Sequence, residues 1–387
     1  MPHEGVGPEA DLVLPRESCD EVCAWICSMC FRCDGVPVSV RCLDLISRLL
    51  FWVSGMTTGD VHDFHRGMWD VLTSSQIVPA SEDEEGVASI DITIPVHAHY
   101  AAVVVPLRKY RLVSTPSNQP RPVLIYFHGG GFCIQSERSK SSHDLVRTLV
   151  KRLGCDAYNV GYRLAPEHPF PHGLRDAYAA LRYVHALTEH AGAPLILAGD
   201  SAGGNFALVL ALCARDEIDA DGRPAAGGAP TLLSRIRHLC LLYPAMNEIT
   251  PSQRSLQMRY LMPRGMRTLY KHSYLGPDEG LHATLQRDWR IAPLRSPSLG
   301  GLPPVSVVSC GMDPLVDEDR MLVAALQRAG NPSVDCIHVE GAIHGFLTLP
   351  SFATSHAQCA NVLDRLEAAV KRSVQVRRGT SMDTGLI

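Results

Sequence analysis

Short apolar runs alternate with amphipathic stretches through most of the chain. Several runs have the length and apolar content expected of buried strands: residues 123–127, 155–162, 194–198, 236–243, 305–309 and 334–339. Apolar side chains recur at helical spacing in other stretches: residues 141–153, 173–187, 202–212, 316–327 and 354–371. This alternation predicts βαβ units and therefore an α/β fold with a mostly parallel sheet.

Two regions depart from this rhythm. Residues 90–94 alternate apolar and polar side chains, and residues 100–105 and 110–113 are strand-like, which predicts antiparallel edge strands leading into the sheet. After residue 244 the rhythm is lost, and the chain becomes rich in Met, Tyr, Arg and Pro. We expect this insertion, about residues 246–300, to form a helical cap over the site.

Residues 1–88 read as a Cys-rich helical extension. Residues 18–52 are apolar but interrupted by charge, which favours two amphipathic helices over a membrane span. The cysteines here fall at helical steps, without the paired knuckles of zinc sites: Cys19, Cys23, Cys27, Cys30, Cys33 and Cys42. Structural or incidental thiols are the favoured interpretation, and acylation, membrane-surface contact, a metal or a disulfide stay open as alternatives.

The rest of the chain has the composition of one large domain, which we place at residues 89–372, followed by a disordered tail at 373–387. Of the 387 residues 46% are hydrophobic, enough for a sizeable core. The 36 basic and 40 acidic side chains give a net charge of −4, so nothing indicates nucleic acid as a partner. The N-terminus lacks the pattern of a secretory signal, and we therefore expect a cytoplasmic protein with free thiols.

Candidate chemistry centres on the sequence Gly-Asp-Ser-Ala-Gly at residues 199–203, which joins an apolar strand directly to a helical run. A strand that turns into a helix at this pattern places the serine in a sharp bend, with its hydroxyl above the edge of the sheet. Glycines are needed on both sides because a side chain there would collide with the neighbouring strand or helix. Ser201 is therefore the candidate nucleophile.

Three successive glycines follow the strand at 123–127, in the sequence His-Gly-Gly-Gly-Phe at residues 128–132. A tight loop would explain them, but they also meet a chemical demand. When an alkoxide attacks an ester carbonyl, negative charge moves onto the oxygen, and backbone N–H groups must already point at it. Glycines let the main chain come that close, so this loop is a candidate oxyanion site.

The hydroxyl of a serine needs an imidazole to take its proton and a carboxylate to orient that imidazole. In a parallel sheet these partners are expected just after the carboxyl ends of later strands. Asp313 and His344 both lie in such positions, and the order Ser, Asp, His is that of the α/β hydrolases. The rival carboxylates are Asp317, which we expect to cap a helix, and two others nearby, Asp319 and Glu340.

The motifs HGGGF, YRLAPEHPFP, GDSAGGN, GMDPLVDE and HGF occur in this order between residues 128 and 346. In this the chain resembles the hormone-sensitive-lipase-like esterases of the α/β-hydrolase fold, over roughly residues 90–370. The resemblance implies an eight-stranded, mostly parallel sheet with a helical cap. It also implies that the backbone N–H groups of Gly130, Gly131 and Ala202 form the oxyanion hole.

These observations predict a serine carboxylesterase of short- to medium-chain acyl esters that needs neither a metal nor an organic cofactor. Hydrolysis of arylamides, by a deacetylase or amidase, is the alternative that uses the same groups. A receptor on an inactive hydrolase scaffold, as in the gibberellin receptors, is disfavoured because His344 is present. Peripheral contact with a membrane or lipid droplet through residues 18–56, and a homodimer, remain open.

Overall fold

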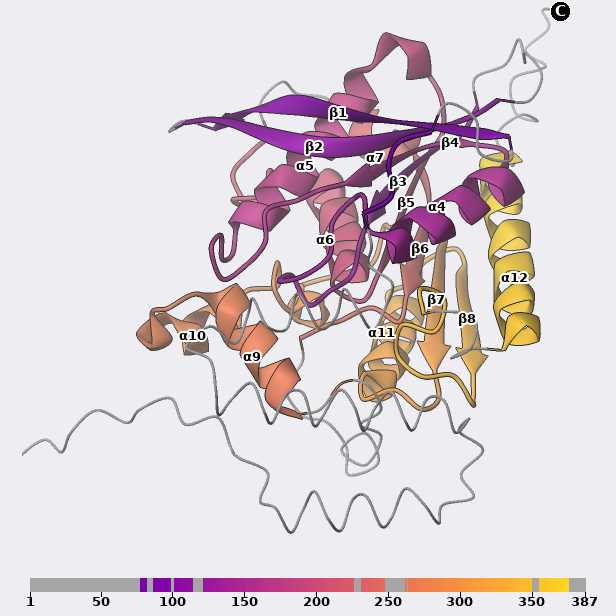
Figure 1. Ribbon diagram of the computed structural model, residues 1–387. Coiled ribbons are helices and arrows are strands. Elements are labelled where there is room, and N and C mark those ends of the chain that lie inside the picture. The colour runs from indigo at the N-terminus through magenta and orange to yellow at the C-terminus, as the bar shows by residue number, and fades with distance from the viewer. Residues whose placement is uncertain are drawn as a thin grey trace, which may run out of the picture.

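A mixed eight-stranded sheet forms the centre of the computed structural model, which describes residues 77–81, 86–98, 101–113, 121–225, 231–247, 262, 264–349 and 355–375. The strand order is β1-β2-β4-β3-β5-β6-β7-β8 (Figure 1). β1 pairs with β2 and β2 with β4 in antiparallel fashion, and every later pairing is parallel. The predicted α/β fold with a mostly parallel eight-stranded sheet is confirmed.

The strands and helices alternate along the chain as the hydrophobic pattern indicates. The strands are β1 (Val87–Ala98), β2 (Ala101–Leu112), β3 (Val123–Phe127), β4 (Asp156–Val160), β5 (Leu195–Asp200), β6 (Ile236–Leu242), β7 (Val305–Cys310) and β8 (Val334–Val339). The helices are α4 (Lys140–Leu153), α5 (His172–Ala186), α6 (Ala202–Asp216), α7 (Thr231–Arg235), α9 (Arg264–Leu275), α10 (Glu279–Leu285), α11 (Val316–Arg328) and α12 (His356–Gln375), with 3₁₀ turns η1 (Thr188–His190) and η2 (Pro293–Arg295).

Helices cover both faces of the sheet, because successive side chains of a strand point to opposite sides. In β3, Ile125 and Phe127 face a core shared with α5, α6 and α11. Leu124 and Tyr126 face the other core, which α4 and α12 close. All five side chains of β3 and all six of β5 are buried. A run that is apolar throughout, rather than alternating, is therefore the signature of these central strands.

The sequence expectations differ from the structure mainly at the edges. The two strand-like stretches at 100–105 and 110–113 are one continuous strand, β2, in register with β1. α12 runs four residues beyond 371, to Gln375, and so extends into the segment assigned to the tail. The expectations for residues 1–76, including the Cys-rich helices, lie outside the described residues. None of the helices in the described ranges combines the length and apolar composition of a membrane crossing.

The insertion between β6 and β7 contains α9 and α10, and Figure 1 shows both beyond the carboxyl ends of the strands. It is attached to the loop of residues 163–171, where the Phe170 N–H donates to the carbonyl of Tyr274 in α9. That loop is in turn fixed by Arg163, whose guanidinium and backbone N–H donate to the fully buried carboxylate of Asp176 at 2.8 to 2.9 Å. An ion pair of this kind gives the proline-rich loop a structural role.

We expect Asp176→Ala to lower the free energy of unfolding by about 3 kcal/mol, because it leaves the Arg163 guanidinium without its buried partner. The matched control is Asp364→Ala, which removes an ion pair to Arg152 at the surface. Because the Asp364 side chain is 67% exposed, its loss should cost less than about 1 kcal/mol. Urea denaturation measures both values. Equal losses in the two variants would contradict the structural role given to Asp176.

Candidate active site

Ser201 lies at the junction of β5 and α6, in a backbone conformation that few residues other than glycine adopt. Its φ is +51° and its ψ is −115°. The glycines around it are required by close packing, since a side-chain carbon on Gly203 would collide with the carbonyl of Phe127 at the end of β3. A side-chain carbon on Gly199 would in turn collide with the backbone of Gly203. The predicted strand, sharp turn and helix are therefore present.

Three side chains from separate segments meet at this turn. His344 Nε2 lies 2.9 Å from Ser201 Oγ, and His344 Nδ1 lies 2.7 Å from Asp313 Oδ2. The second oxygen of Asp313, which is fully buried, accepts from the N–H of Leu315 at 2.8 Å. With the proton on Nδ1, the imidazole donates to the carboxylate and accepts from the serine hydroxyl. The structure thus brings together the three candidates from the sequence.

Asp200, the residue before the candidate nucleophile, connects the elbow to the glycine loop. Its Oδ1 accepts from the N–H of Gly129 at 2.8 Å and from the hydroxyl of Tyr126 at 2.6 Å. The side chain is almost completely buried, and burial raises the pKa of its carboxyl group. The sequence analysis missed this role, although the position of Asp200 inside the pentapeptide was a signal for it.

The glycine loop keeps a conformation that side chains would prevent. Gly130 and Gly131 have φ of +101° and +60°. An added carbon would collide with the Ile134 carbonyl in the first case and with the ring of Tyr270 in α9 in the second. Behind the loop the pKa of His128 is lowered to about 4 by burial, so this ring is neutral near pH 7. Two of the three predicted oxyanion donors, the N–H groups of Gly130 and Gly131, belong to this loop. The third belongs to Ala202, the first residue of α6, whose N–H has no acceptor within the helix.

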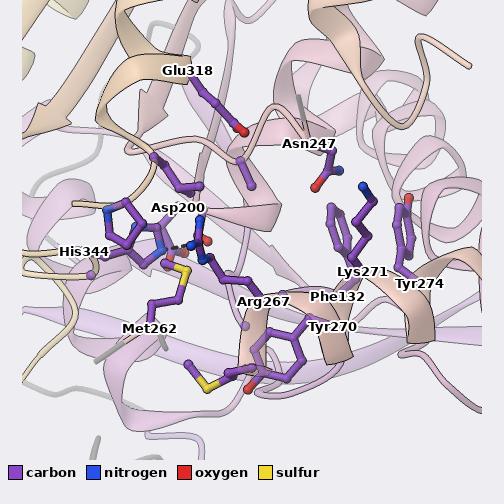
Figure 2. Close-up of a pocket in the computed structure, with 18 of the residues that line it drawn as sticks. Phe132, Asp200, Asn247, Met262, Arg267, Tyr270, Lys271, Tyr274, Glu318 and His344 are labelled. Carbon is purple, nitrogen blue, oxygen red and sulfur yellow. Dashed lines mark hydrogen bonds between the residues drawn. The ribbon is translucent and has the colours of Figure 1, made fainter. Parts of the chain in front are cut away.

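These residues border a cavity of about 390 Å³. Gly130, Gly131, Ser201 and His344 line it from the sheet side, and α9 lines it with aromatic and basic side chains. Figure 2 shows Met262 and Arg267 near His344, and Lys271 and Tyr274 farther along the cavity. The sequence analysis did not predict which cap residues line the cavity. The insertion lacks the alternation of strands and helices, so its sequence does not show which of its side chains face the sheet.

The rival carboxylates lie in other positions. The prediction that Asp317 caps α11 is wrong. Leu315 occupies the cap position, and Asp317 lies in the first turn of the helix. Asp319 is completely buried, and both of its carboxylate oxygens lack a hydrogen-bond partner in the described part of the chain. Burial, with repulsion from Asp313, raises the pKa of Asp319. Glu340 is largely exposed and contacts His338.

The arrangement can perform nucleophilic acyl transfer. A hydroxyl in contact with an oriented imidazole can lose its proton as it attacks a carbonyl carbon. Backbone N–H groups held by the glycine loop can stabilise the negative charge that develops on oxygen. Within the described ranges no group of three or more His, Cys, Asp or Glu side chains is placed to hold a metal ion.

Comparison with known proteins gives a consistent result. The family model described as "alpha/beta hydrolase fold" matches residues 124–348. The Mycobacterium tuberculosis protein named Carboxylic ester hydrolase LipN is 31% identical over 330 residues, 83% of this chain and 80% of that protein. The rice Gibberellin receptor GID1 is 31% identical over 69% of this chain and 73% of its own.

Among solved structures, the ester hydrolase EH1AB1 from the metagenome of Lake Arreo superposes with a TM-score of 0.68. It is 27% identical in sequence, and the match covers 87% of this chain and 98% of that one. In that structure the ester hydrolase is in complex with a derivative of bipyridine phosphonate. The similarity therefore extends over nearly the whole described sheet and its helices.

We expect Asp200→Ala to destabilise the fold by about 2 kcal/mol, because it leaves the buried N–H of Gly129 and hydroxyl of Tyr126 without an acceptor. Asp200→Asn keeps an acceptor oxygen in the same place and should cost less than half as much. Urea denaturation of the two variants beside the wild type measures the difference. Equal destabilisation by Asn and Ala would mean that the negative charge, rather than the acceptor, holds the loop.

Proposed function

The chain belongs to the hormone-sensitive-lipase-like family of the α/β-hydrolase fold and is a carboxylic ester hydrolase; we propose that Ser201, His344 and Asp313 carry out the reaction. The observation that supports these roles most directly is the position of His344, within hydrogen-bond distance of both partners. This geometry also argues against a purely receptor function, since binding alone requires no imidazole against the serine hydroxyl.

In the acylation step, Ser201 Oγ attacks the ester carbonyl carbon while His344 Nε2 takes the hydroxyl proton. Asp313 keeps the imidazole in the required tautomer and stabilises the imidazolium that forms. The carbonyl oxygen becomes negative and receives hydrogen bonds from the N–H groups of Gly130, Gly131 and Ala202. The imidazolium then gives its proton to the leaving alcohol oxygen as the bond from carbon to that oxygen breaks.

In the second step, water attacks the acyl group bound to Ser201, and His344 takes one of its protons. The tetrahedral intermediate collapses, the proton returns to Ser201 Oγ, and the carboxylic acid is released. Asp200 acts as a positioning residue here, because it joins the segment of the nucleophile to the loop of the oxyanion donors. Neither step requires a metal or an organic cofactor.

We propose esters of short- to medium-chain acids as the substrates. A cavity of about 390 Å³ lies at the low end of the range for small-molecule sites. Phe132, Tyr270 and Met266 supply apolar walls against which an alkyl chain of limited length can pack. Arylamides could enter the same cavity, but no contact in the described residues favours an amide over an ester.

Ser201→Ala should lower kcat/KM for p-nitrophenyl butyrate by at least about 10³-fold, because it removes the hydroxyl that lies 2.9 Å from His344 Nε2. His344→Gln should have a loss of similar order, since the two groups act as one unit. Ser296→Ala, which changes a hydroxyl outside the cavity lining, should leave the rate unchanged. A panel of acyl chain lengths and arylamides gives the preference in the same assay. Wild-type activity in Ser201→Ala would refute the proposed roles.

Contact with a membrane or lipid-droplet surface through residues 18–56, and a homodimer, are further proposals about partners. The apolar, cysteine-bearing sequence of residues 18–56 supports the first, and this segment lies outside the described residues. We expect the full chain to float with phosphatidylcholine vesicles in a sucrose gradient, and a chain lacking residues 1–56 to stay in the dense fractions. Identical partitioning of both would refute the membrane contact.

A further inference from the structure

The residue that follows β6 has a backbone conformation that is costly for its type. Tyr243 has a φ of +38°, in the left-handed region that a bulky side chain rarely occupies. Its side chain is completely buried, and its N–H donates to the carbonyl of Val308 in β7 at 2.7 Å, so the chain is still attached to the sheet here. Backbone strain of this kind is concentrated at functional sites.

The positive φ changes the side of the sheet to which the side chain points. Along β6 the side chains alternate, so that Leu241 belongs to the core shared with α5, α6 and α11, and Leu242 to the core that α4 and α12 close. Continued alternation would return residue 243 to the first of these cores. Tyr243 instead lies in the second, on the same side as Leu242. The turn in the backbone therefore moves the phenol ring to the core in which Phe346, from the loop after β8, also packs.

On that side the ring packs against the general base. The centroids of the Tyr243 and His344 rings lie 5.1 Å apart with their planes inclined by 65°, close to the edge-to-face arrangement that aromatic pairs prefer. Phe346, two residues after His344, packs on the same phenol with the centroids 6.0 Å apart. His344 lines the cavity and Tyr243 does not, so the phenol supports the imidazole from within the protein.

The segment around Tyr243 is also fixed to the nucleophile. The N–H of Ser201 donates to the carbonyl of Leu242 at 2.9 Å. The N–H of Ala245 donates to the carbonyl of Ser201, also at 2.9 Å. Tyr243 lies between these two bonds, so its ring refers the orientation of the imidazole to the backbone of the serine.

The two hydrogen bonds of His344 leave one motion of its ring unrestrained. Nδ1 donates to Asp313 at 2.7 Å, and Nε2 accepts from Ser201 at 2.9 Å. Rotation of the imidazole about the line that joins its two nitrogens leaves both distances unchanged. The tilt of the ring nevertheless matters, because Nε2 must take the proton of the serine and then give it to the leaving oxygen. A fixed ring in contact with the imidazole restricts this rotation.

We propose that Tyr243 is a positioning residue for the general base, whose ring holds the plane of the His344 imidazole in the orientation needed for proton transfer. The positive φ is the means, because it directs the ring to the core where the loop of His344 packs. An aliphatic side chain would fill part of the same space without presenting a ring to the imidazole. This inference rests on the proposed function, because it assigns a role in the same reaction.

The experiment separates the ring from its hydroxyl. Tyr243→Phe keeps the ring, and Tyr243→Leu replaces it by an aliphatic side chain; kcat and KM for p-nitrophenyl butyrate are measured well below the unfolding transition of each variant. Tyr243→Leu should lower kcat by roughly 10- to 100-fold, because a displacement of about 1 Å in a catalytic group can cost as much as 10²-fold. Tyr243→Phe should keep kcat within about twofold of the wild type, and KM should change by less than about twofold in both variants, because Tyr243 does not line the cavity.

A matched control accounts for the loss of a buried ring as such. Tyr110 in β2 is also completely buried in the core that α4 and α12 close, and its hydroxyl contacts His143, outside the site. Tyr110→Leu should lower the urea midpoint at least as much as Tyr243→Leu does, but leave kcat of the folded protein unchanged. If Tyr243→Leu does not fold, Tyr243→Met makes the same comparison, since the flexible methionine side chain adapts to irregular spaces.

The pH dependence of kcat/KM distinguishes positioning from an electrostatic effect of the ring. The midpoint of its acidic limb reports the pKa of the general base in the free enzyme. A positioning role predicts that Tyr243→Leu lowers the plateau and leaves this midpoint in place. Inactivation by diethyl p-nitrophenyl phosphate should slow by a similar factor, because the attack of Ser201 on phosphorus requires the same transfer of its proton to His344.

The outcomes separate this inference from the proposed function. An active wild type with unchanged kcat in folded Tyr243→Leu would overturn the positioning role and leave the esterase activity intact. An equal loss of kcat in Tyr243→Phe or in Tyr110→Leu would also overturn it, as would a shifted acidic limb with an unchanged plateau. Failure of the wild type to hydrolyse the ester, or wild-type activity in Ser201→Ala, would refute the proposed function and the positioning role with it.

Discussion

The close contact between the first turn of α6 and the end of β3 is the constraint on which the site depends. Gly203 must lie against the carbonyl of Phe127, and this contact leaves room for no side chain. Because α6 can approach β3 only in this way, the residue that joins β5 to α6 must take a positive φ, and Ser201 does so. The cost of that conformation is balanced by the buried apolar packing of α6, in which nearly every side chain is covered.

The parallel sheet brings residues that are far apart in the sequence close together at one edge. β5, β7 and β8 end at the same side, so the loops that follow them deliver Ser201, Asp313 and His344 to one place. The geometry of the three side chains then depends on local bonds at each strand end, such as the N–H of Leu315 against Asp313. The cap contributes walls to the cavity but none of these three groups.

The sequence predicted the parts of this structure that rest on local rules. Buried strands read as continuous apolar runs, and the spacing of Asp313 and His344 after β7 and β8 followed from the order of the sheet. The cap side chains Lys271 and Tyr274 could not be predicted, because their placement depends on long-range packing between α9 and the loop of residues 163–171. Asp317 was misjudged as a cap for a similar reason, since the α11 boundary is set by the turn at Asp313, whose carboxylate takes the N–H of Leu315.

The bond between Asp200 and Gly129 has a consequence for turnover. α9 forms one wall of the cavity that borders Ser201. The nucleophile and the oxyanion loop are tied to each other through one carboxylate that belongs to the sheet, and the cap is not part of that tie. Substitutions on the cavity-facing side of α9 can therefore change the shape of the cavity while the bond between Asp200 and Gly129 keeps the reacting centre in place.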